Sequence, residues 1–104
     1  MTTFDKREEG FEKRFAHDEE LKFKATARRN RMMGAWAAEK LGLTGPEAEA
    51  YAREVVVADI ETHDPVGKLR KDFDAKGVAQ SDEQIRKVMT DLMARAVSEI
   101  KAGK

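Results

Sequence analysis

Apolar residues recur at helical spacing in four segments of the chain, and short turn sequences separate these segments. The segments run from Leu21 to Leu41, from Thr44 to Thr62, from Asp64 to Gly77 and from Ser81 to Gly103. In each of them apolar positions return every three or four residues, which is typical of a helix with one buried face. No segment alternates with the period of a strand. Four helices joined by short turns predict an all-α fold, a four-helix bundle.

Capping and turn residues mark the expected ends of these helices. Small polar residues before an apolar run are typical helix N-caps. The expected N-caps are Asp18, Thr44, Asp64 and Ser81. Thr44 with Glu47 and Ser81 with Gln84 have the spacing of capping boxes. Glycine followed by an apolar residue indicates a helix stop, and this pair begins at Gly42 and at Gly77.

The predicted core is the set of apolar residues on the inward faces of the four helices. Its members are Leu21, Ala25, Met32, Trp36, Tyr51, Val55, Leu69, Phe73, Ile85, Val88, Met89, Leu92 and Ile100.

The segment before the first predicted helix carries three of the five phenylalanines. Phe4, Phe11 and Phe15 fall within about 40° of one another on a helix, so they form one apolar stripe among charged residues. Burying three phenylalanines stabilises by at most about 5 to 9 kcal/mol, whereas ordering the backbone costs roughly 1 to 2 kcal/mol per residue. Residues 1–17 are therefore predicted to be a mobile, disordered N-terminal arm, and residues 18–104 the bundle.

The phenylalanine stripe and the predicted core residues of the first helix lie on different sides of a helix. On an unbroken helix the stripe lies roughly 70° from the line through Leu21, Ala25, Met32 and Trp36, so the two stripes face different surroundings. An unfolded segment with a preset apolar stripe is suited to fold on a partner's groove. The alternative is that the stripe docks on the protein's own core. Gly10 weakens any helix in the arm by about 1 kcal/mol.

The length, charge balance and apolar content of the chain argue against several classes of function. The chain has 104 residues, 20 basic and 20 acidic side chains, and no cysteine. A single small domain of this length has no room for a deep active site, and balanced charge favours neither DNA nor an anionic membrane. There is no apolar run of the roughly 20 residues that cross a bilayer, and no signal peptide is recognised at the start. We expect a cytoplasmic protein that is not inserted in the membrane.

A cluster of cations follows the arm and supports an alternative function. Its members are Lys22, Lys24, Arg28, Arg29 and Arg31. They could contact phosphate groups or an acidic partner, as in a small helical nucleic-acid- or nucleotide-binding module, or they could form a solvated helix flank. Phe23 is the one aromatic residue among them, whereas single-strand binders interleave several.

Residues that could support catalysis or metal binding do not form a recognisable pattern. His17 and His63 have acidic neighbours, but neither histidine has the i, i+4 or Glu-x-x-His spacing that places metal ligands on one helical face. Ser81 is expected to serve as a helix cap. We therefore expect no catalytic residue, no metal site and no cofactor.

Four contiguous stretches of sequence add a resemblance to a known family. They are FAHDEEL at 15–21, KATARRNR at 24–31, WAAEKLGLTG at 36–45 and EAEAYAREVVVAD at 47–59. Together they resemble the ζ subunit of the alphaproteobacterial F-type ATP synthase, over nearly the whole chain. The resemblance implies a non-enzymatic inhibitor of ATP hydrolysis by the F1 sector, analogous to the mitochondrial inhibitor protein.

The family also implies a mechanism and partners. Its mobile N-terminal region becomes helical as it enters an α/β catalytic interface and approaches the rotor, while the bundle stays outside. The implied partners are the α, β and γ subunits of F1 at the cytoplasmic face of the membrane, with no nucleic acid, and the free protein is expected to be a monomer. Carried onto this chain, the apolar contacts are Phe4, Phe11 and Phe15, and the candidate polar contacts are Arg7, Glu8, Glu12 and Arg14.

Overall fold

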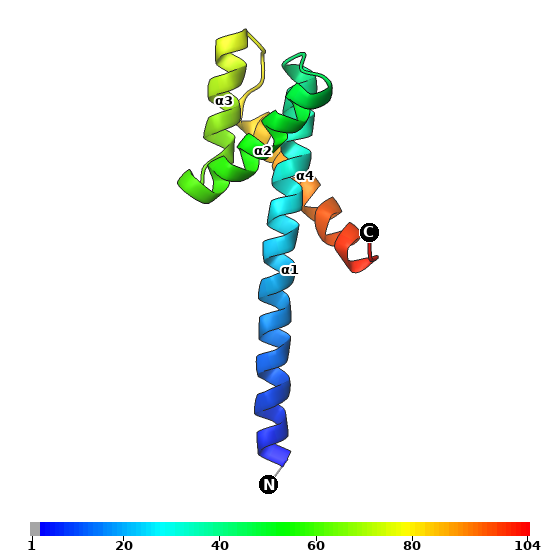
Figure 1. Ribbon diagram of the computed structural model, residues 1–104. Helices are drawn as coiled ribbons and strands as arrows, with labels where there is room; N and C mark the ends of the chain where they lie inside the picture. The colour runs from blue at the N-terminus through cyan, green and yellow to red at the C-terminus, as the bar shows by residue number, and fades with distance from the viewer. Residues whose placement is uncertain (1–2) are drawn as a thin grey trace.

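The computed structural model describes the backbone of residues 3–104 and the side chains of residues 18–104. The helices are α1 (Thr3–Lys40), α2 (Gly45–Thr62), α3 (Pro65–Lys76) and α4 (Asp82–Lys101). No strand occurs in this described part of the chain. The prediction of an all-α, four-helix fold is therefore confirmed (Figure 1).

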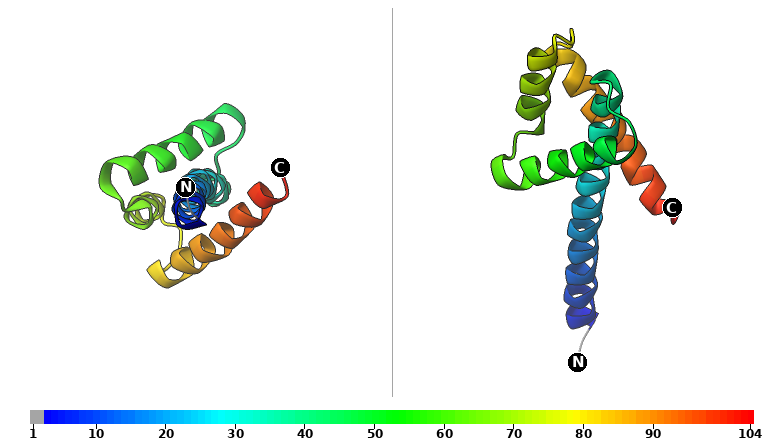
Figure 2. Two further views of the ribbon diagram at one scale, coloured as in Figure 1. Left: turned by 90° about the horizontal axis from the view of Figure 1, so that it is seen from below. Right: turned by 45° about the horizontal axis from the view of Figure 1, so that its top comes forward.

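The C-terminal half of α1 is the centre of the fold. It packs mainly against α2 and α4, which cross α1 on opposite sides at steep angles (Figure 2). Helix α3 connects α2 to α4 and lies beside the end of α1 that is remote from the N-terminus. The core therefore surrounds one half of α1, and the other half extends away from it.

The crossing of α1 and α2 is unusually close at Gly34. A Cβ atom added to Gly34 would lie 2.5 Å from the Ala52 Cα and 3.2 Å from the Val55 Cγ2. Ala52 is itself 6% exposed, so small residues meet on both helices. Because neither residue has a long side chain, the two backbones come nearly into contact and the larger neighbours interlock around them.

The apolar core lies between α1, α2, α3 and α4. Val55, Leu69, Phe73 and Ile85 are fully buried in it. Trp36 packs edge-on against Phe73, with ring centroids 5.7 Å apart and an interplanar angle of 90°. This is a favoured geometry for aromatic pairs, and it joins α1 to α3.

Every residue of the predicted core is buried or half-buried in the structure. The prediction omitted several residues that are fully or almost fully buried: Met33, Ala37, Ala38, Ala52, Val66 and Ala96. The omissions on α1 have one cause. Helices on two sides of α1 bury a wider arc of its surface than a single apolar stripe predicts.

The two predicted helix stops are confirmed. Gly42 and Gly77 adopt left-handed φ values of 77° and 70°. After each glycine the backbone N–H of an apolar residue donates back to the helix, from Leu43 to the Ala38 carbonyl at 2.9 Å and from Val78 to the Phe73 carbonyl at 2.8 Å. This bonding is characteristic of Schellman motifs, in which the apolar residue folds back on the helix.

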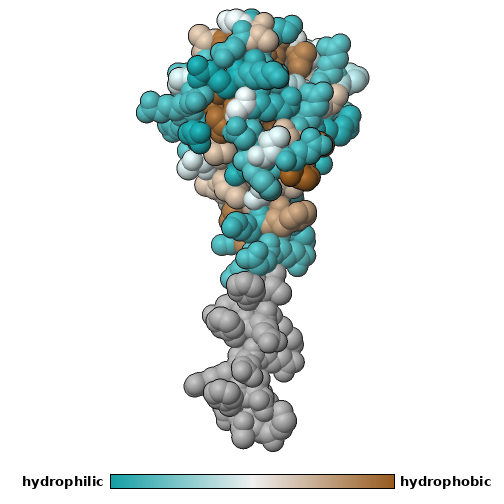
Figure 3. Space-filling model, turned by 90° about the vertical axis from the view of Figure 1, so that its left-hand side faces the viewer, coloured by the Kyte–Doolittle hydropathy of each residue, from teal (hydrophilic) through white to brown (hydrophobic). Residues whose placement is uncertain are grey.

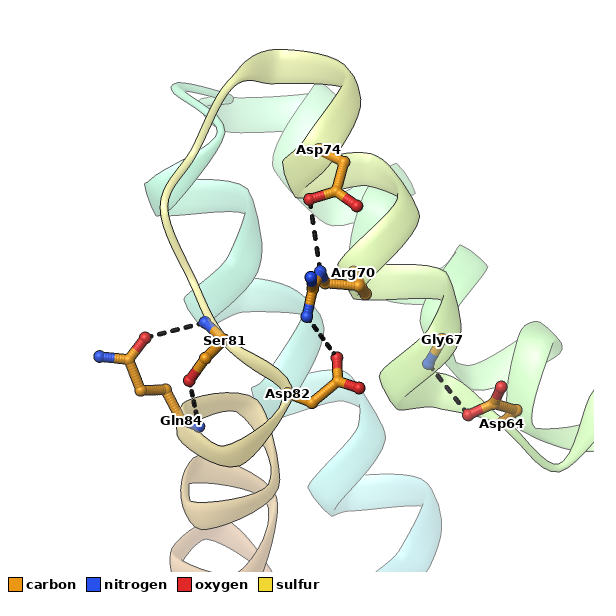
Figure 4. Close-up of polar contacts among 7 residues, drawn as sticks. All are labelled: Asp64, Gly67, Arg70, Asp74, Ser81, Asp82 and Gln84. Carbon is orange, nitrogen blue, oxygen red and sulfur yellow. Dashed lines mark hydrogen bonds and ion pairs between the residues drawn. The ribbon is translucent and has the colours of Figure 1, made fainter.

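Two predicted N-caps are also confirmed (Figure 4). The Ser81 hydroxyl accepts from the Gln84 backbone N–H at 3.1 Å, and the Gln84 side chain accepts from the Ser81 backbone N–H at 2.9 Å, which completes a capping box. The Asp64 carboxylate accepts from the Gly67 N–H at 2.9 Å.

The other two N-cap predictions fail in different ways: the position of Thr44 is confirmed but its capping box is wrong, and the cap at Asp18 is wrong. Thr44 occupies the N-cap position of α2, but its side chain makes no capping hydrogen bond, so the capping box with Glu47 does not form. The first turn is altered because Gly45 has a left-handed φ of 54° and Pro46 has no N–H to donate. Asp18 lies inside α1 and not at its start, since residues 18–21 contain neither glycine nor proline to end a helix.

The close crossing predicts that Gly34→Ala destabilises the protein by about 1 to 3 kcal/mol. The added methyl group gains about 1 kcal/mol of helix propensity, but it overlaps the Ala52 backbone, which no side-chain rotation can relieve. Urea denaturation followed by circular dichroism measures the change. Ala35→Ser at the exposed neighbouring position is the control, and it should change the free energy of unfolding by less than about 0.5 kcal/mol. A Gly34→Ala variant as stable as the parent would contradict the close packing.

The aromatic pair predicts a second loss of stability. Trp36→Ala should lower the free energy of unfolding by about 3 kcal/mol, the lower end of the range for buried aromatics, because Trp36 is only half-buried. Phe23→Ala is a matched control on the same helix, since Phe23 is 75% exposed and its loss should leave the denaturation midpoint nearly unchanged. Equal midpoints for the two variants would show that Trp36 does not belong to the core.

Candidate functional site

The predicted arm contacts precede the residues whose side chains are described. They are Phe4, Arg7, Glu8, Phe11, Glu12, Arg14 and Phe15. Their roles lie outside the described side chains and stay predictions. The mobility expected of residues 1–17 in the free protein also stays a prediction, and the backbone from Thr3 onward is part of α1. The cluster of cations that follows the arm lies within the described part.

The five cations do not form one face. At about 100° per residue, Lys24, Arg28 and Arg31 share one side of α1, whereas Lys22 and Arg29 lie on the opposite side. The contacts of Arg29 agree with this division, because its guanidinium is directed to α2 and its side chain is only 14% exposed. The cluster of cations therefore contains residues with different surroundings.

Arg29 belongs to a buried polar network between α1 and α2. Asn30 is 2% exposed, and its Nδ2 donates to the Asp59 carboxylate at 2.7 Å. The Arg29 Nε and Nη2 donate to the Asn30 Oδ1 at 3.2 and 2.9 Å, and Arg29 lies 3.8 Å from Asp59. Every buried polar side-chain atom in the described part has a partner, so the network satisfies the requirement for burying charge.

The structural role of Asn30 was not predicted from the sequence. Its sequence signal is weak: asparagine is a poor helix former in the middle of a strongly helical segment. Such a residue often has a specific hydrogen-bond partner, but the sequence does not indicate that the partner is Asp59.

An open groove of about 610 Å³ lies where α1, α2 and α4 meet. Its apolar lining consists of Phe23, Ala27, Met32, Val56 and Ile100. Its basic lining consists of Lys24, Arg28, Arg31 and Lys104, and its one acidic residue is Glu99. We call this the α1–α4 groove. It combines an apolar floor with a basic rim.

The cations of the groove differ in how they are paired. Arg28 donates from Nη2 to the Lys104 backbone carbonyl at 2.6 Å and lies 3.5 Å from Glu99, which fastens the end of α4 to α1. Lys24 pairs with Glu20 at 3.0 Å on the exposed surface. Among the described side chains, Arg31 makes no ion pair or hydrogen bond. Arg31 is thus available to an external acidic group, as is the ammonium group of Lys104, which also has no partner among the described side chains.

Elsewhere on the bundle, exposed apolar residues are few. Outside the groove the large ones are Val57 and Ile60, which are 47% and 67% exposed. The face drawn in Figure 3 is mostly hydrophilic, with small and separate apolar patches. The groove is therefore a described surface where apolar area and an unpaired cation occur together.

Tyr51 and Arg70 have raised pKa values, and both take part in contacts that hold α3 against neighbouring helices. Burial, and then a 2.7 Å hydrogen bond to the Asp72 carboxylate, raise the pKa of the Tyr51 hydroxyl. The Lys68 ammonium lies 3.0 Å from the same carboxylate and 5.0 Å from the centre of the Tyr51 ring. A hydrogen bond to Asp82, and then the charge of Asp74, raise the pKa of Arg70 (Figure 4). These contacts join α3 to α2 and to α4, and they do not line the groove.

Among the residues that were considered for catalysis or metal binding, those with described side chains have structural roles. His63 closes α2 in a left-handed conformation, with φ of 56°, and its N–H donates to the Asp59 carbonyl. Ser81 is a helix cap, and the side chain of His17 lies outside the described residues. In residues 18–104 no group of three or more histidine, cysteine, aspartate or glutamate side chains is placed to hold a metal ion. None of the described helices has both the length and the hydropathy needed to span a membrane.

Comparison with known proteins also covers residues 1–17, whose side chains the structure does not describe. The family model described as ATPase inhibitor subunit zeta matches residues 1–99 of this chain. A comparison with curated proteins found none that matches. The family match covers the arm and all four helices nearly to the end of α4, in agreement with the resemblance seen in the sequence. The chain belongs to the ATPase inhibitor subunit zeta family.

Proposed function

We propose that the protein is a non-catalytic regulatory subunit that blocks ATP hydrolysis by the F1 sector of an ATP synthase. The observation that carries the proposal is the family match, which begins at residue 1 and continues through the bundle to residue 99. The arm is thus part of the matched unit. The arm, residues 1–17, would enter an α/β catalytic interface and approach the γ subunit at the cytoplasmic face of the membrane, while the free protein is a monomer.

The arrangement of α1 supports a mechanical mode of inhibition. The same helix that forms the centre of the core continues toward the arm. Force on an inserted arm would pass along α1 to α2 and α4, which hold it from opposite sides. A helix with its other end fixed in a packed bundle resists being drawn through the interface. The inhibitor would therefore oppose rotation in the hydrolytic direction.

The energetics of the arm suit reversible inhibition. Burial of Phe4, Phe11 and Phe15 in the complex would contribute at most about 5 to 9 kcal/mol. The cost of ordering the arm opposes this contribution, so burial of the phenylalanines alone does not hold the arm tightly. Arg7, Glu8, Glu12 and Arg14 would add polar contacts that fix the register. The arm can then be displaced when the rotor turns in the direction of synthesis.

The alternative function, a nucleic-acid- or nucleotide-binding module, has less support. Of the five cations on which it depends, Lys24, Arg28 and Arg29 are each paired with an acidic residue of the chain. The salt dependence of binding separates the two functions, because phosphate contacts weaken steeply as salt rises. Burial of phenylalanine depends much less on salt.

Deletion of residues 1–17 should abolish inhibition of F1 ATP hydrolysis and leave the bundle folded. The described core begins at Ala25, and helical phase predicts that the phenylalanines of the arm lie on a different stripe. Titration of the truncated protein against F1 ATPase activity tests inhibition, and circular dichroism with urea denaturation tests folding. Phe11→Ala in the full chain should raise the half-inhibitory concentration tenfold or more, whereas Lys13→Ala is the matched control on the charged face. If the truncated protein inhibits as well as the full chain, the arm is not the inhibitory element.

Gly10→Ala should strengthen inhibition. Alanine favours a helix over glycine by about 1 kcal/mol, which corresponds to roughly a fivefold lower half-inhibitory concentration when the arm binds as a helix. The same ATPase titration measures it, with Gly10→Pro as the opposing variant that should nearly eliminate inhibition. Equal inhibition by the alanine and proline variants would show that residue 10 is not helical in the complex.

A further inference from the structure

We infer that the α1–α4 groove is a second docking site for the ATPase and that it takes an acidic, amphipathic segment of that partner. The segment would place an apolar side chain against Phe23 and a carboxylate against Arg31. The inference rests on the proposed function and deepens it, because it assigns to the bundle a specific surface that contacts the inhibited enzyme.

The exposed aromatic ring of Phe23 is the first observation. Phe23 is 75% exposed although it borders a groove with an apolar floor. A large aromatic side chain contributes most when a partner covers it, and such residues are frequent anchors of protein interfaces. Ile60 is almost as exposed, but it lies outside the groove lining. The groove therefore offers an anchor next to a cavity that a partner side chain can fill.

The charge of the groove selects the chemistry of the partner. Four basic residues line it against the single acid Glu99, and Glu99 already contacts Arg28 at 3.5 Å and Arg95 at 3.0 Å. Arg31 has no such partner within the described side chains. A guanidinium binds a carboxylate through two parallel hydrogen bonds, so an acidic protein segment complements both the charge of Arg31 and the apolar floor. A nucleic acid would complement only the charge, because Phe23 is the one aromatic residue in the lining.

The position of the groove connects it to the arm. Phe23 follows the last residue of the arm by six positions, which is about 9 Å along a helix. A protein that encloses residues 1–17 must come within this distance of the groove. On a continuous helix Arg31 lies about 160° to 180° around the axis from Phe4, Phe11 and Phe15. The Arg31 side of the groove therefore faces the wall of the binding cleft opposite the one contacted by the phenylalanine stripe, and Phe23 lies between the two, about 80° to 120° from the stripe.

The experiment uses the full chain and purified F1, and it measures both binding affinity and inhibition of ATP hydrolysis. The groove variants are Phe23→Ala and Arg31→Glu. The matched controls are Ile60→Ala, which removes an exposed apolar side chain elsewhere, and Arg53→Glu, which reverses an exposed charge outside the groove. Each groove variant should weaken F1 binding fivefold or more, and neither control should change it by more than twofold. Arg31→Glu should also reduce the salt dependence of binding.

The outcomes separate the groove from the arm. F1 binding by both groove variants at parental affinity, together with loss of inhibition in Phe11→Ala, overturns the groove and leaves the proposed function intact. Weakened binding by the groove variants, together with full inhibition by the protein lacking residues 1–17, supports the groove and overturns the arm mechanism. Absence of F1 binding by the unmodified chain overturns both. If Phe23→Ala changes the sedimentation mass of the free protein and not its affinity for F1, the groove binds a second copy of the chain, and the inference is wrong.

Discussion

The close approach of α1 and α2 at Gly34 determines the arrangement of the other helices. With the Ala52 backbone almost touching Gly34, α2 can cross α1 only where both helices lack long side chains. This crossing places Val55 in the core and brings Asp59 within hydrogen-bond distance of Asn30. The buried polar network then fixes the rotation of α2 about its own axis, because a small rotation would leave a buried charge without its partner. The sharp turn from His63 to Pro65 starts α3 from that fixed end, so α3 reaches Trp36 from α2.

Helix α1 consequently combines two roles along its length. Its C-terminal half is covered by α2 and α4 and has small or apolar residues on most of its circumference, including Ala37 and Ala38. Around residues 23–32 the cover is incomplete, and the open side becomes the α1–α4 groove. Arg28 limits this opening from one end, because its contacts with Glu99 and the Lys104 carbonyl hold α4 against α1. The groove is thus a consequence of two helices that diverge from α1 after crossing it.

The parts of the fold that sequence predicted are those determined within a few residues. The stops at Gly42 and Gly77 and the caps at Asp64 and Ser81 depend on local dihedral angles and neighbouring N–H groups, so each could be recognised from its own segment. Thr44 shows the limit of this approach, since it occupies the expected N-cap position, but the left-handed Gly45 changes the first turn and the capping hydrogen bond does not form. The Gly34 crossing and the Asn30 network were not predicted, because both depend on which residues of a distant segment lie opposite. For the candidate site, the cluster of cations was recognised from sequence, but its division between interior and groove required the position of α2.

Some cations of α1 stabilise the fold and others are free to contact a partner. This difference allows inhibition and folding to depend on different residues of one short chain. Arg29 stabilises the interface of α1 with α2, and Arg28 stabilises that with α4, so substitution of either would disturb folding as well as any contact with a partner. Arg31 and Phe23 carry no comparable internal contact and are exposed. Surfaces that can change without unfolding the bundle are the ones on which partner specificity can vary, since a change there alters binding and leaves the free energy of unfolding nearly the same. The arm stripe is predicted to have the same property, because its phase on a helix differs from that of the core residues. In the proposed inhibitor, both contact regions therefore lie on α1 before the Gly34 crossing. Residues that hold α1 in the bundle occur in the same stretch, at Arg28, Arg29 and Asn30, and continue at the crossing and beyond it.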